Sequence, residues 1–178
     1  MTNRDLQRRF VYCAVVAGKN ARFAANAVNR LFDPANADPF DLINVWHGCG
    51  ALENQLRMAR TGNYRKLTRC LPAATRLDLR TCTVEDLESI HGIGPKSARF
   101  FMLWTRPDSE VAALDVHVMR WLRRQGHDCP ESTPSRASYP KWERAYLEEA
   151  RSRSLTAAQL DAQIWERNSR FPEAQLRF

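Results

Sequence analysis

The chain has 178 residues, of which 44% are hydrophobic, so it is long enough to bury one sizeable core or two small lobes that share a cleft. Its 27 Lys and Arg residues against 20 Asp and Glu give a net charge of +7, and this excess is spread through the middle of the chain. A distributed excess suits a polyanion partner such as nucleic acid better than a disordered basic arm would, although a solvated basic surface explains the charge equally well.

The cysteines argue against both a zinc site and a disulfide framework. There are five, which are widely spaced: Cys13, Cys49, Cys70, Cys82 and Cys129. None forms a Cys-x-x-Cys pair or stands at ligand spacing from a histidine, so we expect a reducing compartment. No segment reads as a signal peptide, and the apolar stretch at residues 10–17 is too short to span a bilayer. We therefore expect a cytoplasmic protein, nucleoid-associated if bacterial, with no membrane partner.

The hydrophobic pattern predicts an all-α fold, because apolar residues recur at helical spacing and no segment alternates at period two. In the first half of the chain we expect helices at residues 4–17, from about 21 to 32, and at 40–47, 51–60 and 64–75. The predicted turns lie at Gly18-Lys19-Asn20, residues 33–39, Gly48-Cys49-Gly50 and Thr61-Gly62-Asn63.

A helical hairpin is predicted next. Thr83 followed by Asp86 has the form of a capping box, so a helix should begin there and bury Val84, Leu87 and Ile90. A second helix should run from Pro95, which suits a first helical position, to about residue 105. Between them stands Gly92-Ile93-Gly94, in which we expect both glycines to adopt conformations closed to other residues. The exposed N–H groups and the helix dipole would then form a site for a phosphate oxygen, while an ordinary interhelical turn is the alternative.

The last part of the chain is also predicted to be helical. Asp115 stands where an N-cap is wanted, before residues 116–122. Residues 125–140 are polar and contain Gly126 and three prolines, which predicts a loop or insertion. Helices at about 141–152 and 156–168 should follow, the second with Leu160 and Ile164 on one face.

Two segments resemble a known family. They are Leu87-Glu88-Ser89-Ile90-His91-Gly92-Ile93-Gly94-Pro95-Lys96-Ser97-Ala98 and Leu114-Asp115-Val116-His117-Val118-Met119-Arg120. They resemble the helix-hairpin-helix Gly/Pro-Asp (HhH-GPD) superfamily of DNA glycosylases, which includes endonuclease III and the 8-oxoguanine DNA glycosylases. In that pattern an aspartate opens the helix after the hairpin, often with a histidine two residues later. Asp115 follows Lys96 by 19 residues, which matches the 8-oxoguanine branch.

The resemblance implies a fold of two helical lobes with the DNA and base cleft between them. Residues 1–178 would form a single glycosylase unit, with the helix-hairpin-helix at about 83–105 and the helix of the catalytic aspartate at about 115–124. No cysteine follows Cys129, so the four-cysteine iron–sulfur motif of endonuclease III is missing. We expect no iron–sulfur cluster, no required cofactor and no other metal, apart from room for a monovalent cation at the hairpin. The partner would be double-stranded DNA that contains a modified base, bound by a monomer.

Catalysis is predicted to rest on Lys96 and Asp115. Loss of a base passes through an oxocarbenium-like transition state, which an anion at Asp115 would stabilise, although the same carboxylate also suits a plain N-cap. Family members that also cleave the backbone carry a lysine where Lys96 falls. A neutral Lys96 would attack C1′ and form a Schiff base, while a simple phosphate contact is the alternative.

The remaining site predictions concern binding. We expect DNA contacts from Gly92, Ile93, Gly94, Ser97, Arg99 and His117, with His117 more structural than chemical. Asn20 or Lys19 falls where family members fill the gap left by the extruded base, although a simple turn is the favoured interpretation there. Six aromatic residues offer stacking surfaces, most of them expected in the core: Trp46, Tyr64, Trp104, Trp121, Trp142 and Trp165.

Three functions follow from these features. The first is a DNA glycosylase of base excision repair with associated β-lyase activity, acting on a damaged base such as the oxidised purine 8-oxoguanine. The second is a glycosylase without lyase activity that removes a hypermodified base, such as a glycosylated hydroxymethylpyrimidine, from viral DNA as antiviral defence. The third is a non-catalytic helix-hairpin-helix DNA-binding module, which would not require Asp115 at the family's spacing.

Overall fold

The computed structural model describes residues 1–32 and 37–168, and over these residues the chain is helical without a β-strand, which confirms the predicted all-α class. The described residues divide into two compact units, residues 1–93 and residues 94–168, and each is described by itself. The turn predicted at residues 33–39 lies partly outside the described residues. None of the described helices is both long and apolar enough to cross a bilayer.

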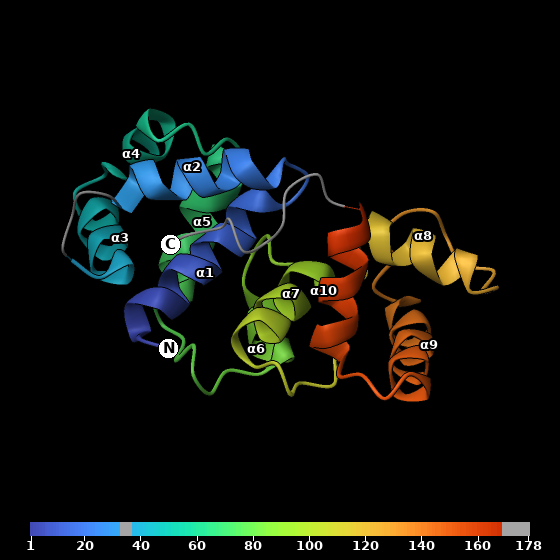
Figure 1. The fold of residues 1–178 in the computed structure, drawn as a ribbon. Coiled ribbons are helices and arrows are strands. Elements are labelled where there is room, and N and C mark those ends of the chain that lie inside the picture. The colour runs from blue at the N-terminus through green and yellow to red at the C-terminus, as the bar shows by residue number, and fades with distance from the viewer. Residues whose placement is uncertain (33–36, 169–178) are drawn as a thin grey trace. The chain divides into compact units, whose positions relative to one another are not determined.

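Within its described residues the first unit contains six helices, coloured blue to yellow-green in Figure 1. They are α1 (Asn3–Val16), α2 (Ala21–Phe32), α3 (Pro39–Gly48), α4 (Leu52–Met58), α5 (Tyr64–Ala74) and α6 (Val84–Ser89). Helix α1 is central to this unit because it packs against α2, α3 and α5. The predicted helices and the turns at residues 18–20, 48–50 and 61–63 are confirmed to within about two residues.

The core of this unit is built on the second half of α1. Residues 10–15 are all buried, and the ring of Phe10 meets Phe40 of α3 edge-on at 6.1 Å. Arg8 is also buried, and its Nη2 donates to Oδ1 of Asn29 on α2 at 2.9 Å. This bond matters because a buried guanidinium without partners would be costly.

The second unit contains α7 (Pro95–Thr105), α8 (Val116–Arg124), α9 (Tyr139–Ser152) and α10 (Ala157–Asn168). Helix α10 packs against the other three. Its residues Leu160 and Ile164 are both buried, as their shared face predicts. Tyr146 of α9 is buried too, and its hydroxyl donates to the carbonyl of Ala157 at 2.8 Å, which ties α9 to the start of α10.

One boundary in this unit was predicted wrongly. The polar loop was expected to reach Pro140, but α9 begins at Tyr139, with Pro140 in its first turn. A proline within a helix would break it, but in a first turn its missing N–H removes no helical hydrogen bond. This earlier start of α9 places Tyr139 on the helix, from which it contacts the segment before Asp115.

Candidate functional site

The hairpin begins as predicted. Thr83 caps α6 in a capping box, in which its hydroxyl accepts from the N–H of Asp86 at 3.1 Å and its own N–H donates to the Asp86 carboxylate at 2.8 Å. Leu87 and Ile90 are buried, whereas Val84 is half-buried and not in the core as predicted.

The two glycines of the hairpin differ from each other. Gly92 has a φ of +85°, which L side chains rarely adopt, and a Cβ there would lie 2.6 Å from Cγ of Lys66. Gly94 has a φ of −99° and a ψ of 174°, an extended conformation open to any residue. The prediction that both glycines need special conformations is therefore wrong for Gly94.

Gly94 instead leaves space in front of α7. It is the N-cap of this 11-residue helix. Among the described residues, no side chain caps the first turn, and a Cβ on Gly94 would meet no atom within 4 Å. The first N–H groups of a helix have no partner within it and carry the positive end of the dipole. The start of α7 is therefore open to an anion, which fits the predicted phosphate site.

Lys96 lies in this first turn of α7 and is half-buried. Its Nζ lies 5.0 Å from the centroid of the Phe100 ring, one helical turn further on. Within the described chain, the Lys96 ammonium makes neither a hydrogen bond nor an ion pair.

Asp115 caps α8 through one of its two oxygens. Its Oδ1 accepts from the N–H of His117 at 2.8 Å and from the N–H of Val118 at 2.9 Å. Over residues 1–32 and 37–168, its Oδ2 accepts no hydrogen bond from the protein. The predicted N-cap is thus confirmed, and it leaves one oxygen of a half-buried carboxylate for another partner.

The segment before Asp115 is held by α9. The Tyr139 hydroxyl donates to the carbonyl of Ala112 at 2.8 Å and accepts from the N–H of Leu114 at 2.9 Å. Oε1 of Glu143 accepts from the N–H of Ala112 at 2.8 Å. Three backbone groups within three residues of Asp115 are thus bound by two side chains of one helix.

Arg99 joins α7 to this arrangement. Its Nε donates to Oε1 of Glu143 at 2.7 Å, and its guanidinium lies 4.6 Å from the centroid of the Tyr139 ring. The Arg99 and Glu143 side chains are only 13% and 14% exposed, so the pair is largely shielded from solvent. Arg99 therefore supports the two residues that position Asp115, and its predicted DNA contact stays a prediction.

The other predicted DNA-binding side chains are mostly enclosed. Ile93 and Ser97 are buried at 4% and 8% exposure, so any DNA contact by them would be through the backbone. His117 is half-buried against Trp165 of α10, with ring centroids 5.6 Å apart, and its buried Nδ1 has no hydrogen-bond partner among the described residues.

The turn between α1 and α2 holds the predicted gap-filling residues. Asn20 is exposed, and its Oδ1 accepts from the N–H of Phe23 at 3.2 Å, which caps α2. Lys19 is half-buried, and its Nζ donates to the carbonyl of Thr61 at 2.5 Å. Both contacts are structural, and a role in filling a gap in DNA stays a prediction.

The aromatic side chains divide into core and partly exposed residues. Trp121 and Trp142 are buried, whereas the other four are half-buried: Trp46, Tyr64, Trp104 and Trp165. Trp46 stacks on Phe32, and Trp104 stacks on Phe100. The sequence predicts that most of the six lie in the core, but only two of them are buried.

A basic hollow lies along the C-terminal part of α8. It has a volume of about 570 Å³ and is lined by Arg120, Arg123, Arg124 and Glu131. Arg123 pairs with Glu131, while Arg120 and Arg124 have no partner among the described residues. Like charges at i and i+4 destabilise a helix slightly, so this surface suits an anionic partner.

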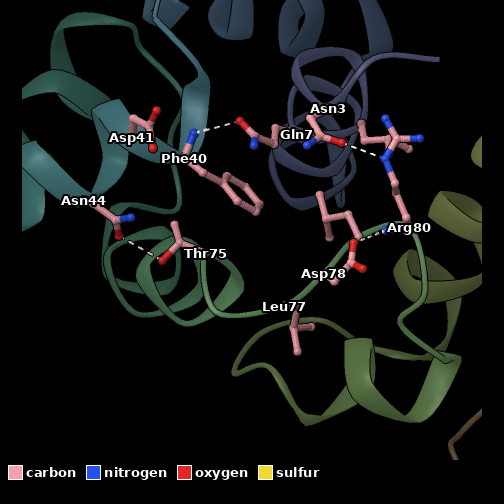
Figure 2. Close-up of a pocket in the computed structure, with 11 residues that line it drawn as sticks. Asn3, Gln7, Phe40, Asp41, Asn44, Thr75, Leu77, Asp78 and Arg80 are labelled. Atoms are coloured by element: carbon pink, nitrogen blue, oxygen red, sulfur yellow. Dashed lines mark hydrogen bonds between the residues drawn. The ribbon is translucent and has the colours of Figure 1, made fainter.

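A second hollow, of about 250 Å³, lies in the first unit between α1, α3 and the segment after α5 (Figure 2). Its polar residues bond mainly to one another. Gln7 accepts from the N–H of Phe40, and Thr75 donates to Asn44. This hollow contains none of the predicted site residues.

Sequence reasoning missed Tyr139 and Glu143 as parts of the site. Neither belongs to a recognisable motif, and Tyr139 was placed in a loop. Only the contacts of α9 with the segment before Asp115 reveal them.

No family model matches the chain. Among solved structures, it is similar to the 8-oxoguanine glycosylase/lyase of Methanocaldococcus jannaschii in complex with a 15mer DNA containing 8-oxoguanine. The TM-score is 0.72 and the identity 22%, over 96% of this chain and 84% of the other. A structure of the 8-oxoguanine DNA glycosylase of the same organism matches with a TM-score of 0.71 and 24% identity, over 94% of this chain and 79% of the other. The chain therefore shares the helical fold of these 8-oxoguanine DNA glycosylases.

Proposed function

We propose that this protein is a DNA glycosylase that excises a damaged base from double-stranded DNA and then cleaves the resulting site as a β-lyase. The preferred substrate class is an oxidised purine such as 8-oxoguanine. Both solved structures of the same fold are 8-oxoguanine DNA glycosylases, and one of them is in complex with DNA that contains 8-oxoguanine. The protein would act as a monomer in base excision repair.

The geometry of Asp115 carries this proposal. Two N–H groups of α8 hold Oδ1, and Oδ2 has no protein donor in the described chain. The two N–H groups fix the position of the carboxylate at the start of α8. A fixed anion beside the sugar would stabilise the positive charge that develops on C1′ and O4′ as the base leaves.

Lys96 is the proposed nucleophile. Its amine makes no hydrogen bond or ion pair among the described residues and contacts only the face of Phe100 there, and it lies in the open first turn of α7. A neutral amine would attack C1′ while the bond from C1′ to the base nitrogen breaks and the base leaves with the electron pair and takes up a proton. Opening of the sugar ring then gives a Schiff base between Lys96 and C1′. A proton acceptor next removes a proton from C2′, and the 3′ phosphate leaves by β-elimination.

The open start of α7 would hold the DNA. Gly94 leaves the first-turn N–H groups accessible, and these groups bind phosphate without reading sequence. Such a contact suits an enzyme that must test many positions for a damaged base. The exposed arginines of α8 add positive charge on the same unit.

Borohydride trapping tests the proposal. Wild-type protein is incubated with duplexes that carry 8-oxoguanine or other oxidised bases, and sodium borohydride reduces any Schiff base to a stable covalent complex. We expect a trapped complex with wild-type protein and none with Lys96→Gln. Lys141→Gln is the matched control and should trap like the wild type.

Two other results would change the proposal in different ways. Release of free base without trapping would leave a glycosylase that lacks lyase chemistry. Failure to release any base from any duplex, with DNA binding intact, would contradict the enzymatic proposal and favour a DNA-binding module.

A further inference from the structure

Two lysines of the first unit link the end of α1 to the start of α5, and one of them, Lys66, packs against Gly92. Lys66 is on α5, and its side-chain stem fills the space that a Cβ on Gly92 would need, at 2.6 Å from the Lys66 Cγ. Lys19 is in the turn after α1, and a Cβ on Gly62 would lie 3.0 Å from its Nζ. Both side chains are half-buried.

Each ammonium group bonds to one backbone carbonyl. Lys66 Nζ donates to the carbonyl of Ala14 near the end of α1 at 3.0 Å, and Lys19 Nζ donates to the carbonyl of Thr61 at 2.5 Å. A lysine ammonium has three N–H donors, so two on each lysine have no protein acceptor in the described part of the chain. Neither lysine forms an ion pair with a carboxylate of the described residues.

The pKa values of both lysines are lowered. Burial lowers the pKa of Lys66, and the thiol of Cys70 opposes this shift only in part. Burial and then the charge of Lys66 lower the pKa of Lys19. Two half-buried ammonium groups that repel each other would be stabilised by an anion placed between their free donors.

We propose that Lys19 and Lys66 together bind one phosphate of the DNA backbone next to the Gly92 turn. This inference rests on the proposed function, because the hairpin is what brings DNA to these lysines. Phosphates follow each other about every 3.4 Å of helix axis along a strand. A strand that contacts the hairpin therefore offers a further phosphate within reach of the Lys66 side chain, which packs directly on Gly92.

The salt dependence of DNA binding tests this site. Affinity for a 15-base-pair duplex without damage is measured between 50 and 300 mM KCl for wild type and for Lys19→Met/Lys66→Met, in which the methionine stem keeps the packing against Gly92. Loss of one phosphate contact should reduce the slope of log K against log salt by about 0.9 and weaken binding at 0.1 M salt about tenfold.

The matched control is Lys141→Met/Arg144→Met, which also removes two positive charges, from exposed positions on α9. It should change the slope less than the lysine pair does. An unchanged slope in Lys19→Met/Lys66→Met, or equal changes in the two double variants, would overturn the proposal. Thermal melting checks that each variant is folded, and Lys19→Arg/Lys66→Arg should restore the slope.

Lysine NMR gives a second test, because a purely structural role predicts no change in the lysine pKa values when DNA is added. The chain has four lysines, so ¹³Cε labelling gives four signals. Added duplex should raise the pKa of Lys19 and Lys66 above their values in the free protein. The absence of a rise, or an equal rise with inorganic phosphate at the same concentration as the duplex, would overturn the proposal.

Base release and the salt slope together distinguish a failure of the lysine site from a failure of the proposed glycosylase function. Base release by Lys19→Met/Lys66→Met with an unchanged salt slope would remove the lysine site and leave the glycosylase. A reduced slope in a protein that releases no base would leave the lysine site and remove the glycosylase.

Discussion

The hydroxyl of Tyr139 bridges the carbonyl of Ala112 and the N–H of Leu114, the residue directly before Asp115. Because Tyr139 is 1% exposed and Leu114 is fully buried, water cannot easily replace these bonds. The orientation of the Asp115 carboxylate, which we propose to be catalytic, therefore depends on a side chain 24 residues further along the sequence.

Tyr139→Phe should lower both stability and turnover. The variant removes two hydrogen bonds and leaves the buried N–H of Leu114 and the carbonyl of Ala112 with only their 3.1 Å bond to each other. The loss of the two bonds should cost about 1–3 kcal/mol of unfolding free energy. Urea unfolding measures this loss, and single-turnover base release should slow as well. Tyr146→Phe is the control, since it also removes a buried hydroxyl of α9, but one that bonds to Ala157. Equal slowing in both variants would contradict a specific role of Tyr139.

Gly92→Ala and Gly94→Ala should separate stability from binding. At Gly92 the left-handed backbone alone costs about 1–2 kcal/mol for alanine, and the contact with Lys66 adds to this. At Gly94 an alanine fits the backbone, but its methyl group would stand in front of α7. We expect Gly92→Ala to lower the melting temperature, and Gly94→Ala to keep it while weakening duplex binding. Unchanged DNA affinity in Gly94→Ala would argue against a phosphate at this position.

Cys49 should be the thiol that reacts first. None of the five cysteines, which all lie among the described residues, forms a disulfide, and Cys49 is exposed while the other four are buried. Mass spectrometry after brief treatment with iodoacetamide should find one label on the native protein and five after unfolding. Rapid labelling of a second cysteine in native protein would show that a buried thiol is reached by local opening.

Ionisation of the Cys70 thiol should lower the unfolding free energy of the protein at alkaline pH. Burial raises the pKa of this thiol to about 11, from an ordinary value of 9.0, and the charge of Lys66 opposes this only in part. The folded state then binds the proton more tightly than the unfolded state, so stability falls as pH rises from about 9 to 11. Cys70→Ala should show a shallower fall over this range in urea unfolding, and parallel curves would contradict the assignment.

Most helices could be predicted because their ends carry local chemistry. The Thr83 capping box, Pro95 at the start of α7 and the Asp115 cap each act within one turn, and all three have the predicted geometry. The position of Pro140 was predicted wrongly because a proline is common both in loops and in the first turn of a helix.

The site was harder to predict where it depends on contacts between distant segments. Lys96 and Asp115 stand out through their motif, and their placement is as expected for helix starts. The bonds of Tyr139, Glu143 and Arg99 to one another and to residues 112–114 join three separate segments. Residue spacing in the sequence does not indicate such contacts between distant segments. The sequence therefore predicts only a DNA contact for Arg99.

Base release by Asp115→Asn is the most direct test of the proposed chemistry. Asparagine caps helices as well as aspartate does, so α8 should form and duplex binding should persist. The negative charge is lost, and we expect single-turnover release of the damaged base to fall by about 10² or more. Lys96→Gln measured in parallel should lose trapping as well. If Asp115→Asn releases base at the wild-type rate, the proposed role of Asp115 is contradicted.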